Sequence, residues 1–206
     1  MTATLLATLL LLSASTVYAT PLPLPPPDCN QWDDQAIAHT AFGPLHWDAK
    51  EFPLTLLVDF RLTTRERMIL DEAVTTWNRV LGFTAFQISP IIVGGKLSKL
   101  YSLPFKGPFI PITYIDDNVG AADNTAGITS LSSLTAHINN AIVLIKPKLG
   151  SILRTVIIHE LGHVLGLGHD PNNALSIMHP VAYEFNLFFE LEDIYYVRSK
   201  RHLSCQ

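Results

Sequence analysis

Three histidines lie close together in the segment 159–170, which reads His-Glu-Leu-Gly-His-Val-Leu-Gly-Leu-Gly-His-Asp. On a helix, His159 and His163 project from one face about one turn apart, because they are four residues apart. Two imidazole nitrogens at that spacing can share one tetrahedral zinc ion, with N–Zn distances of about 2.0–2.1 Å. A catalytic zinc usually has three protein ligands and one open position for water. The spacing therefore predicts a zinc site that needs a third ligand.

His169 can supply that ligand only if the helix ends before it. A continued helix would carry His169 about 9 Å along the axis from His163, at roughly 1.5 Å per residue. Gly166 stands where the chain must turn, since glycine enters conformations with φ > 0 without a Cβ clash. Gly168 adds further freedom. The sequence thus predicts one zinc ion held by His159, His163 and His169.

Glu160 adjoins the first of these ligands and is not needed as a ligand itself. A carboxylate beside zinc-bound water can take its proton, while the metal lowers the pKa of that water from 15.7 to about 7. General acid–base catalysis of this kind typically contributes ~10²–10⁴ in rate. Glu160 is therefore the predicted general base of a hydrolytic reaction.

The segment 159–170 resembles the zinc signature of the metzincin proteases. Metzincins also carry a methionine turn a little downstream, and Ser-Ile-Met-His-Pro stands at 176–180, with Met178 as the turn methionine. This resemblance implies an α+β, zincin-like fold. Its parts are a twisted mixed β-sheet with an edge strand over the cleft, three main helices, and a zinc site on the active-site helix and the following turn.

The details point to several metzincin branches. Asp170 after the third histidine is typical of adamalysins, and Ser-Ile-Met-His is similar to the astacin sequence. Pro180 and a final helix at 191–197 resemble the matrixins, the branch that the chain is most like. By this resemblance, Thr155, Pro180 and Tyr183 line the pocket for the residue after the scissile bond, although Tyr183 stands one position later than in the matrixin pattern.

The region before the zinc segment is predicted to contain a strand and then a long helix. Leu54–Asp59 is rich in β-favouring residues, and Thr63-x-x-Glu66 is a capping box that begins a helix. Gly82 suits the end of that helix. Its buried face follows the 3-4 spacing of apolar residues and consists of Leu70, Ala73, Val74, Trp77 and Leu81.

Further strands are predicted at 83–88, 91–93, 112–115, 127–131 and 141–145. The last is an unbroken apolar run, which indicates a strand buried on both faces. By resemblance, 127–131 is the edge strand over the cleft, where an extended peptide substrate can pair as an added strand. Ser151 is predicted to cap the active-site helix.

The N-terminal part of the chain divides into two predicted segments before a catalytic domain at 46–206. Residues 1–19 have a leucine-rich run and small residues before Thr20, which is typical of a cleaved signal peptide. The alternative is an uncleaved signal anchor, but the run is short for a membrane span. Residues 20–45 form a proline-rich leader. We therefore expect a secreted, extracellular protein without a stable membrane span.

Cys29 and Cys205 are the only cysteines in the sequence. In a secreted protein we expect a disulfide between them. The alternative is a thiolate from Cys29 at the open zinc position, as in matrixin propeptides. Here the surrounding residues at 27–31, Pro-Asp-Cys-Asn-Gln, lack most of the matrixin motif.

Asp116, Asp117, Asn118 and Asp123 form an acidic turn that could hold calcium, which takes 6–8 oxygen ligands. The alternative is an ordinary solvated turn. The structural-zinc loop of matrixins, with its histidines and aspartates, is not visible here, and His137 stands alone in that region, so a second zinc is not carried over from the resemblance. The formal net charge is −4 without a basic run, which argues against nucleic-acid binding.

Together these features predict a secreted, monomeric zinc metalloendopeptidase that hydrolyses peptide bonds of extracellular or matrix-type proteins with Glu160 as general base. Two alternatives stay open. One is a secreted zinc-containing binding or attachment protein with little catalysis. The other is a gluzincin-type peptidase, in which Glu190 or Glu192 would replace His169 as the third ligand.

Overall fold

The computed structural model describes residues 39–40, 43–93, 108–115, 124–133, 135–184 and 188–200. The predicted signal peptide, most of the leader, both cysteines and the acidic turn at 116–123 lie outside the described residues. Within the described ranges, no helix is both long and apolar enough to cross a membrane.

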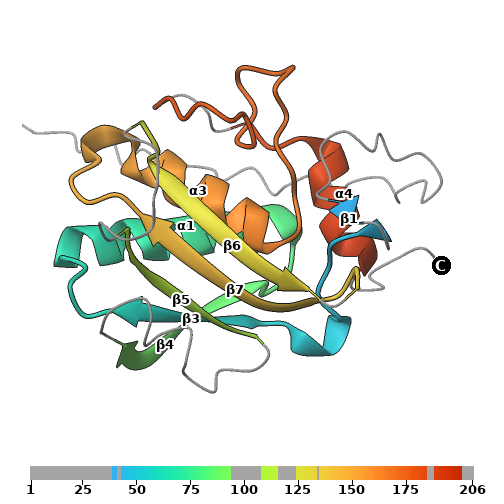
Figure 1. The fold of residues 1–206 in the computed structure, drawn as a ribbon, viewed down its shortest axis with the longest axis horizontal. Coiled ribbons are helices and arrows are strands. Elements are labelled where there is room, and N and C mark those ends of the chain that lie inside the picture. Colours follow the sequence, from blue (N-terminus) through green and yellow to red (C-terminus); the bar gives the residue numbers. More distant parts are fainter. Residues whose placement is uncertain are drawn as a thin grey trace, which may run out of the picture.

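A five-stranded sheet forms the centre of the fold (Figure 1). Its strands lie in the order β4 (Phe86–Val93), β3 (Leu54–Asp59), β5 (Phe109–Tyr114), β7 (Ile138–Ile145) and β6 (Gly127–Ser133). The first four strands run parallel, and β6 pairs antiparallel with β7 at the edge. The structure thus confirms a mixed sheet with 127–131 in an edge strand. A small antiparallel sheet, β1 (His39–Thr40) with β2 (Gly43–Pro44), precedes it.

Three α-helices complete the described fold, as predicted. They are α1 (Thr64–Leu81), α3 (Leu153–Val164) and α4 (Leu191–Lys200). α1 and α3 pack against each other on one side of the sheet, α3 also contacts β6 and β7, and α4 contacts α1 (Figure 1). The predicted buried strand is confirmed, because each residue from Ala141 to Ile145 is at most 4% exposed.

The capping box and the glycine stop of α1 form as predicted. The Thr63 side chain accepts a hydrogen bond from the Glu66 amide, and the Glu66 carboxylate accepts one from the Thr63 amide at 2.8 Å. Gly82 ends the helix in the left-handed region, at φ 75°. The whole predicted apolar face of α1 is buried against the sheet and α3.

The second strand differs from the prediction, since 83–88 and 91–93 belong to one strand that begins only at Phe86. Asn78 of α1 explains the late start. Its side-chain oxygen accepts hydrogen bonds from the amides of Ala85 and Phe86, at 2.8 and 2.9 Å, and its amide donates to the Phe86 carbonyl. Pro90 is tolerated inside the strand because β4 is an edge strand with a register shift near it.

The start of the active-site helix also differs from the prediction. A short 3₁₀ helix, η3 (Gly150–Ile152), runs directly into α3, whose N-cap is Ile152 and not Ser151. An N-cap side chain bonds the helix amides from an extended backbone. Here Ile152 is already helical, at φ −78° and ψ −8°, and no side chain caps the helix.

We predict that Asn78→Ala lowers the free energy of unfolding by about 2–3 kcal/mol, because it removes three hydrogen bonds that join α1 to the start of β4. Thr75→Ala is the matched control, since Thr75 is exposed on the same helix. Urea unfolding of both variants tests this. Equal stability of the two variants would contradict the role given to Asn78.

Candidate active site

The helix α3 presents His159, Glu160 and His163 on one face and is held from behind by two tryptophans. The Trp77 indole donates to the Ile158 carbonyl at 2.9 Å, and the Trp47 indole donates to the Val164 carbonyl at 2.7 Å. Both tryptophans are at most 1% exposed. These contacts fix the rotation of the helix and so the direction of its polar face.

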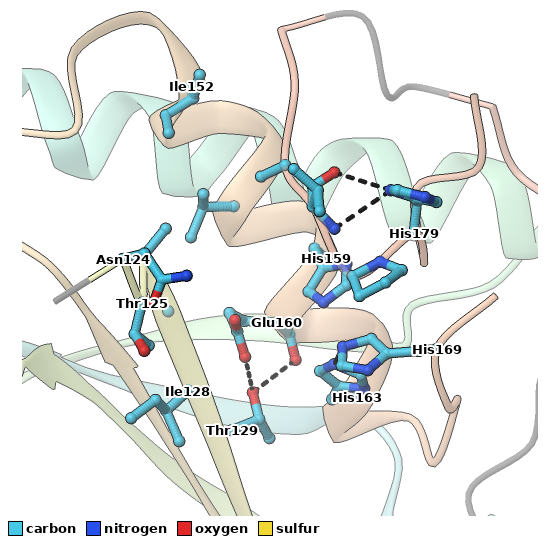
Figure 2. A pocket seen from close by; sticks show the side chains of 16 residues that line it. Asn124, Thr125, Ile128, Thr129, Ile152, His159, Glu160, His163, His169 and His179 are labelled. Atoms are coloured by element: carbon cyan, nitrogen blue, oxygen red, sulfur yellow. Dashed lines mark hydrogen bonds between the residues drawn. The ribbon is translucent and has the colours of Figure 1, made fainter. Parts of the chain in front are cut away.

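The chain turns back directly after α3, as the glycine position predicted. Gly166 has φ 93°, and its amide bonds the His163 carbonyl at 2.9 Å. A Cβ on Gly166 would also overlap the carbonyl oxygen of Leu45. The turn brings His169 back, so that its Nε2 lies 3.1 Å from Nε2 of His163 (Figure 2).

The three histidines form a group that could hold a metal ion. One ligand atom from each of His159, His163 and His169 lies within 4.8 Å of the others. Donor nitrogens at N–Zn distances of about 2.0–2.1 Å are roughly 3.3 Å apart in a tetrahedral site, so this group fits zinc. Glu190, one of the two candidate ligands in the gluzincin alternative, instead accepts a hydrogen bond from Asn173.

Hydrogen bonds to backbone carbonyls orient two of these rings. Nδ1 of His159 donates to the Ile177 carbonyl at 2.7 Å, and Nδ1 of His163 donates to the Leu167 carbonyl at 2.8 Å. Because a carbonyl only accepts, each Nε2 is left with its lone pair for a metal. Burial is the main cause that lowers the pKa of His159 to about 3 and of His163 to about 4. Both rings are therefore neutral, the form that binds metal.

The predicted methionine turn packs against α3 and bonds to His159 and to Asp170, the residue after His169. Met178 is fully buried, and its sulfur packs so closely on Gly162 of α3 that a Cβ there would overlap it. The Met178 carbonyl accepts from the Asp170 amide at 2.9 Å. Met178 thus contacts the chain before His169, at Gly162, and after it, at Asp170. The neighbouring Ile177 carbonyl orients the ring of His159.

Glu160 faces the edge strand β6. It is 4% exposed, and the Thr129 hydroxyl donates to its carboxylate at 2.6 Å (Figure 2). The same hydroxyl lies 3.0 Å from the backbone oxygen of Glu160. A Cβ on Gly127 would overlap the carboxylate. Burial raises the pKa of Glu160 to about 7, against the lowering effect of the Thr129 hydrogen bond.

A cavity of about 560 Å³ joins the histidines, Glu160 and the edge strand. Its walls also include Ile128 of β6, Ile152 and Val156 at the start of α3, and four residues after Met178, namely His179, Pro180, Val181 and Ala182. Of the predicted pocket residues, Pro180 lies in the wall. Thr155 and Val156 are both buried, at 2% exposure, but only Val156 is among the residues that line this cavity. Tyr183 is 41% exposed beyond the wall and stacks on His179.

Several wall residues escaped the sequence analysis. Thr129 lies in the predicted edge strand, and the period of two along a strand puts it on the same face as Gly127. Which face meets Glu160, however, depends on how β6 packs on α3. Ile152 and Val156 lie on the same helix face as His159 and His163 at 3-4 spacing, which is a signal that could have identified them.

A model of the matrixin family, peptidase M10, matches residues 61–197, more than half of the chain. The chain belongs to the matrixin family. This matrixin is therefore a zinc metalloprotease, and the resemblance expected from the sequence is confirmed. A search of curated proteins finds no match.

Among solved structures, this matrixin is similar to high choriolytic enzyme 1, a hatching-enzyme zinc protease from the medaka fish Oryzias latipes. The sequence identity is 13% and the TM-score is 0.46, over 84% of this chain and 97% of that one. A likeness this distant carries no conclusion about activity, which rests on the family match and on the site.

We predict that Gly166→Ala destabilises the matrixin fold and weakens zinc binding without changing a ligand. An L-residue in the left-handed region costs about 1–2 kcal/mol, and here the added Cβ also overlaps Leu45. Gly82→Ala is a matched control, because Gly82 has φ 75° with nothing within 4 Å of its Cβ position. Thermal unfolding and a zinc titration test this. A Gly166→Ala variant that behaves like Gly82→Ala would contradict it.

Proposed function

We propose that this matrixin is a secreted endopeptidase that cleaves within extended segments of extracellular or matrix-type proteins, with Glu160 as general base. One observation carries the proposal. The buried Glu160 carboxylate, the three histidines and the edge strand β6 border a single cavity. A peptide bond bound in this cavity next to the histidines would also lie next to the Glu160 carboxylate and the edge strand.

The edge strand supports binding of a peptide in extended form. β6 is the last strand in the sheet, and an extended segment can add to such an edge through main-chain hydrogen bonds. Ile128, Ile152 and Val156 give the cavity an apolar wall next to the histidines. We infer that an apolar side chain next to the scissile bond fills this space. The leucine-rich run and small residues within 1–19 support secretion.

In the proposed reaction, water is added across the peptide bond. Zinc, when bound by the histidines, supplies Lewis acidity, which polarises a carbonyl oxygen and lowers the pKa of water to about 7. Glu160 takes a proton from the attacking water and gives it to the leaving amine. The carbon–nitrogen bond breaks, the hydroxyl stays on the carbonyl carbon, and Glu160 ends in its starting ionisation state.

Thr129 has a positioning role in this proposal. Thr129 belongs to the strand to which the peptide would add, and its hydroxyl donates a hydrogen bond of 2.6 Å to the Glu160 carboxylate. A hydrogen bond to the charged form of a carboxyl group favours that form. Thr129 therefore opposes the effect of burial on the pKa of Glu160 and keeps it available as a base.

We predict that Glu160→Ala keeps about one zinc ion at the three-histidine site and the same fold, yet lowers peptide cleavage by at least ~10². Asp71→Ala serves as control, because Asp71 is an exposed acidic residue on α1. Cleavage of a mixed peptide library with zinc analysis tests both variants. Full turnover by Glu160→Ala would refute the assigned base. Zinc binding without cleavage by the wild type would favour the binding-protein alternative.

We further predict that Thr129→Val lowers kcat more than it changes KM, whereas Thr129→Ser restores most of the rate. Because the Thr129 hydrogen bond lowers the pKa of Glu160, its loss raises that pKa. Only deprotonated Glu160 accepts a proton, so the acidic limb of the kcat/KM profile should move to higher pH in Thr129→Val. An unmoved limb, or a Ser variant as slow as Val, would rule out the positioning role.

A further inference from the structure

A fourth histidine, His179, lines the catalytic cavity and is not used by the reaction proposed above. It begins the segment 179–182, which lines the cavity opposite the edge strand β6 (Figure 2). Figure 2 places Glu160 and Thr129 on one side of His159 and His179 on the other. The carboxylate that accepts a proton and the ring of His179 thus lie on opposite sides of the three-histidine group.

One nitrogen of the His179 ring is held by the backbone. Nδ1 accepts a hydrogen bond from the Val181 amide at 3.2 Å and lies 3.1 Å from the Val181 carbonyl oxygen. The amide always carries a hydrogen, so Nδ1 must offer its lone pair, and the neutral ring carries its hydrogen on Nε2. Tyr183 stacks on the same ring, with centroids 6.2 Å apart and planes inclined by 29°. These two contacts fix the direction of the Nε2–H bond.

His179 lies near the metal group without belonging to it. Among the described residues, the ligand atoms that lie within 4.8 Å of one another here come from His159, His163 and His169, and not from His179. Burial is the largest cause that lowers the pKa of His159 and of His169, and the charge of His179 lowers both further. His179 is therefore close enough to act on a group bound at the histidines, while the ligand set is complete without it.

The position of His179 suits a carbonyl oxygen of a peptide that pairs with β6. In an antiparallel pair, every second residue exchanges both hydrogen bonds with the neighbouring strand, and the residues between do not. The carbonyls of those residues point away from β6, towards the segment that begins with His179. When water attacks such a carbonyl carbon, an electron pair of the C=O bond moves onto the oxygen. A donor fixed where this charge develops stabilises the transition state.

We propose that His179 is a further catalytic residue, whose Nε2–H donates a hydrogen bond to the carbonyl oxygen of the scissile bond as that oxygen becomes negatively charged. This inference rests on the endopeptidase function proposed above. His179 keeps its proton throughout, while Glu160 transfers the proton of the attacking water to the leaving amine. The oxygen returns its electron pair to the carbon, and the C=O bond forms again as the carbon–nitrogen bond breaks.

Two substitutions separate this role from support of the turn. His179→Asn keeps an acceptor for the Val181 amide, because asparagine bonds the backbone two residues on in Asx-turns, but it has no donor at the position of Nε2. His179→Gln places an amide donor near that position. Loss of one such donor typically costs ~10²–10³ in kcat, and zinc polarises the same oxygen. We therefore expect kcat to fall at least ~10-fold in His179→Asn with little change in KM, and to recover in part in His179→Gln.

Binding of a phosphinic peptide gives a measurement that does not require turnover. Its tetrahedral, charged phosphinate group resembles the transition state, so its Ki should rise in His179→Asn by about the factor by which kcat/KM falls. Zinc per chain and thermal unfolding should match the wild type in both variants, because His179 is not among the metal ligands. In ¹⁵N–¹H spectra of the histidine rings, neutral His179 should carry its hydrogen on Nε2.

Wild type and Glu160→Ala distinguish failure of this inference from failure of the function on which it rests. A wild type that cleaves no peptide would overturn both. Cleavage that is lost in Glu160→Ala but complete in His179→Asn would overturn only the role of His179, because a turn-supporting histidine gives that result. An unchanged Ki for the phosphinic peptide in His179→Asn, or a neutral His179 ring with its hydrogen on Nδ1, would also overturn it.

Discussion

The active site depends on where one helix ends. α3 carries two of the three histidines, but the third reaches them only because the chain leaves the helix after Val164 and reverses at Gly166. The reversal needs a residue with a positive φ and without a Cβ atom, because the Leu45 carbonyl oxygen lies where a Cβ on Gly166 would be. The same constraint therefore joins the metal group to the N-terminal segment of the domain. Met178 packs against Gly162 of α3, and its carbonyl accepts a hydrogen bond from the amide of Asp170 in the returning chain.

The reactive carboxylate is governed by two opposing effects. Burial favours the neutral form of Glu160, while the hydroxyl of Thr129 favours the charged form. Because Thr129 belongs to the edge strand, the element that would bind an extended peptide also holds the base. Gly127 allows this close approach, since any side chain there would displace the carboxylate. In the proposed mechanism, substrate alignment and proton transfer would thus depend on the same packing of β6 against α3.

Local sequence patterns predicted most of the fold and the central residues of the site. The capping box at Thr63, the apolar face of α1 and the histidine spacing are short-range signals, so they could be read without a structure. Contacts between segments that are far apart in the sequence could not be predicted in this way. Asn78 bonds the start of β4, and Thr129 bonds Glu160. Asp48 lies close to His137. All three contacts arise from tertiary packing alone. The cavity is lined by Val156 and not by its neighbour Thr155, and a motif match does not resolve this difference, because neighbouring residues on a helix differ in direction by about 100°.

The docking of Leu45 sets a boundary for any maturation of the chain. Its carbonyl accepts a hydrogen bond from the Tyr196 hydroxyl and lies against Gly166, and two residues later Trp47 bonds the end of α3. Proteolytic trimming of the proline-rich leader must therefore stop before Leu45 if the turn that carries His169 is to keep its support. A new N-terminus only a few residues further along would leave Gly166 facing solvent instead of a carbonyl.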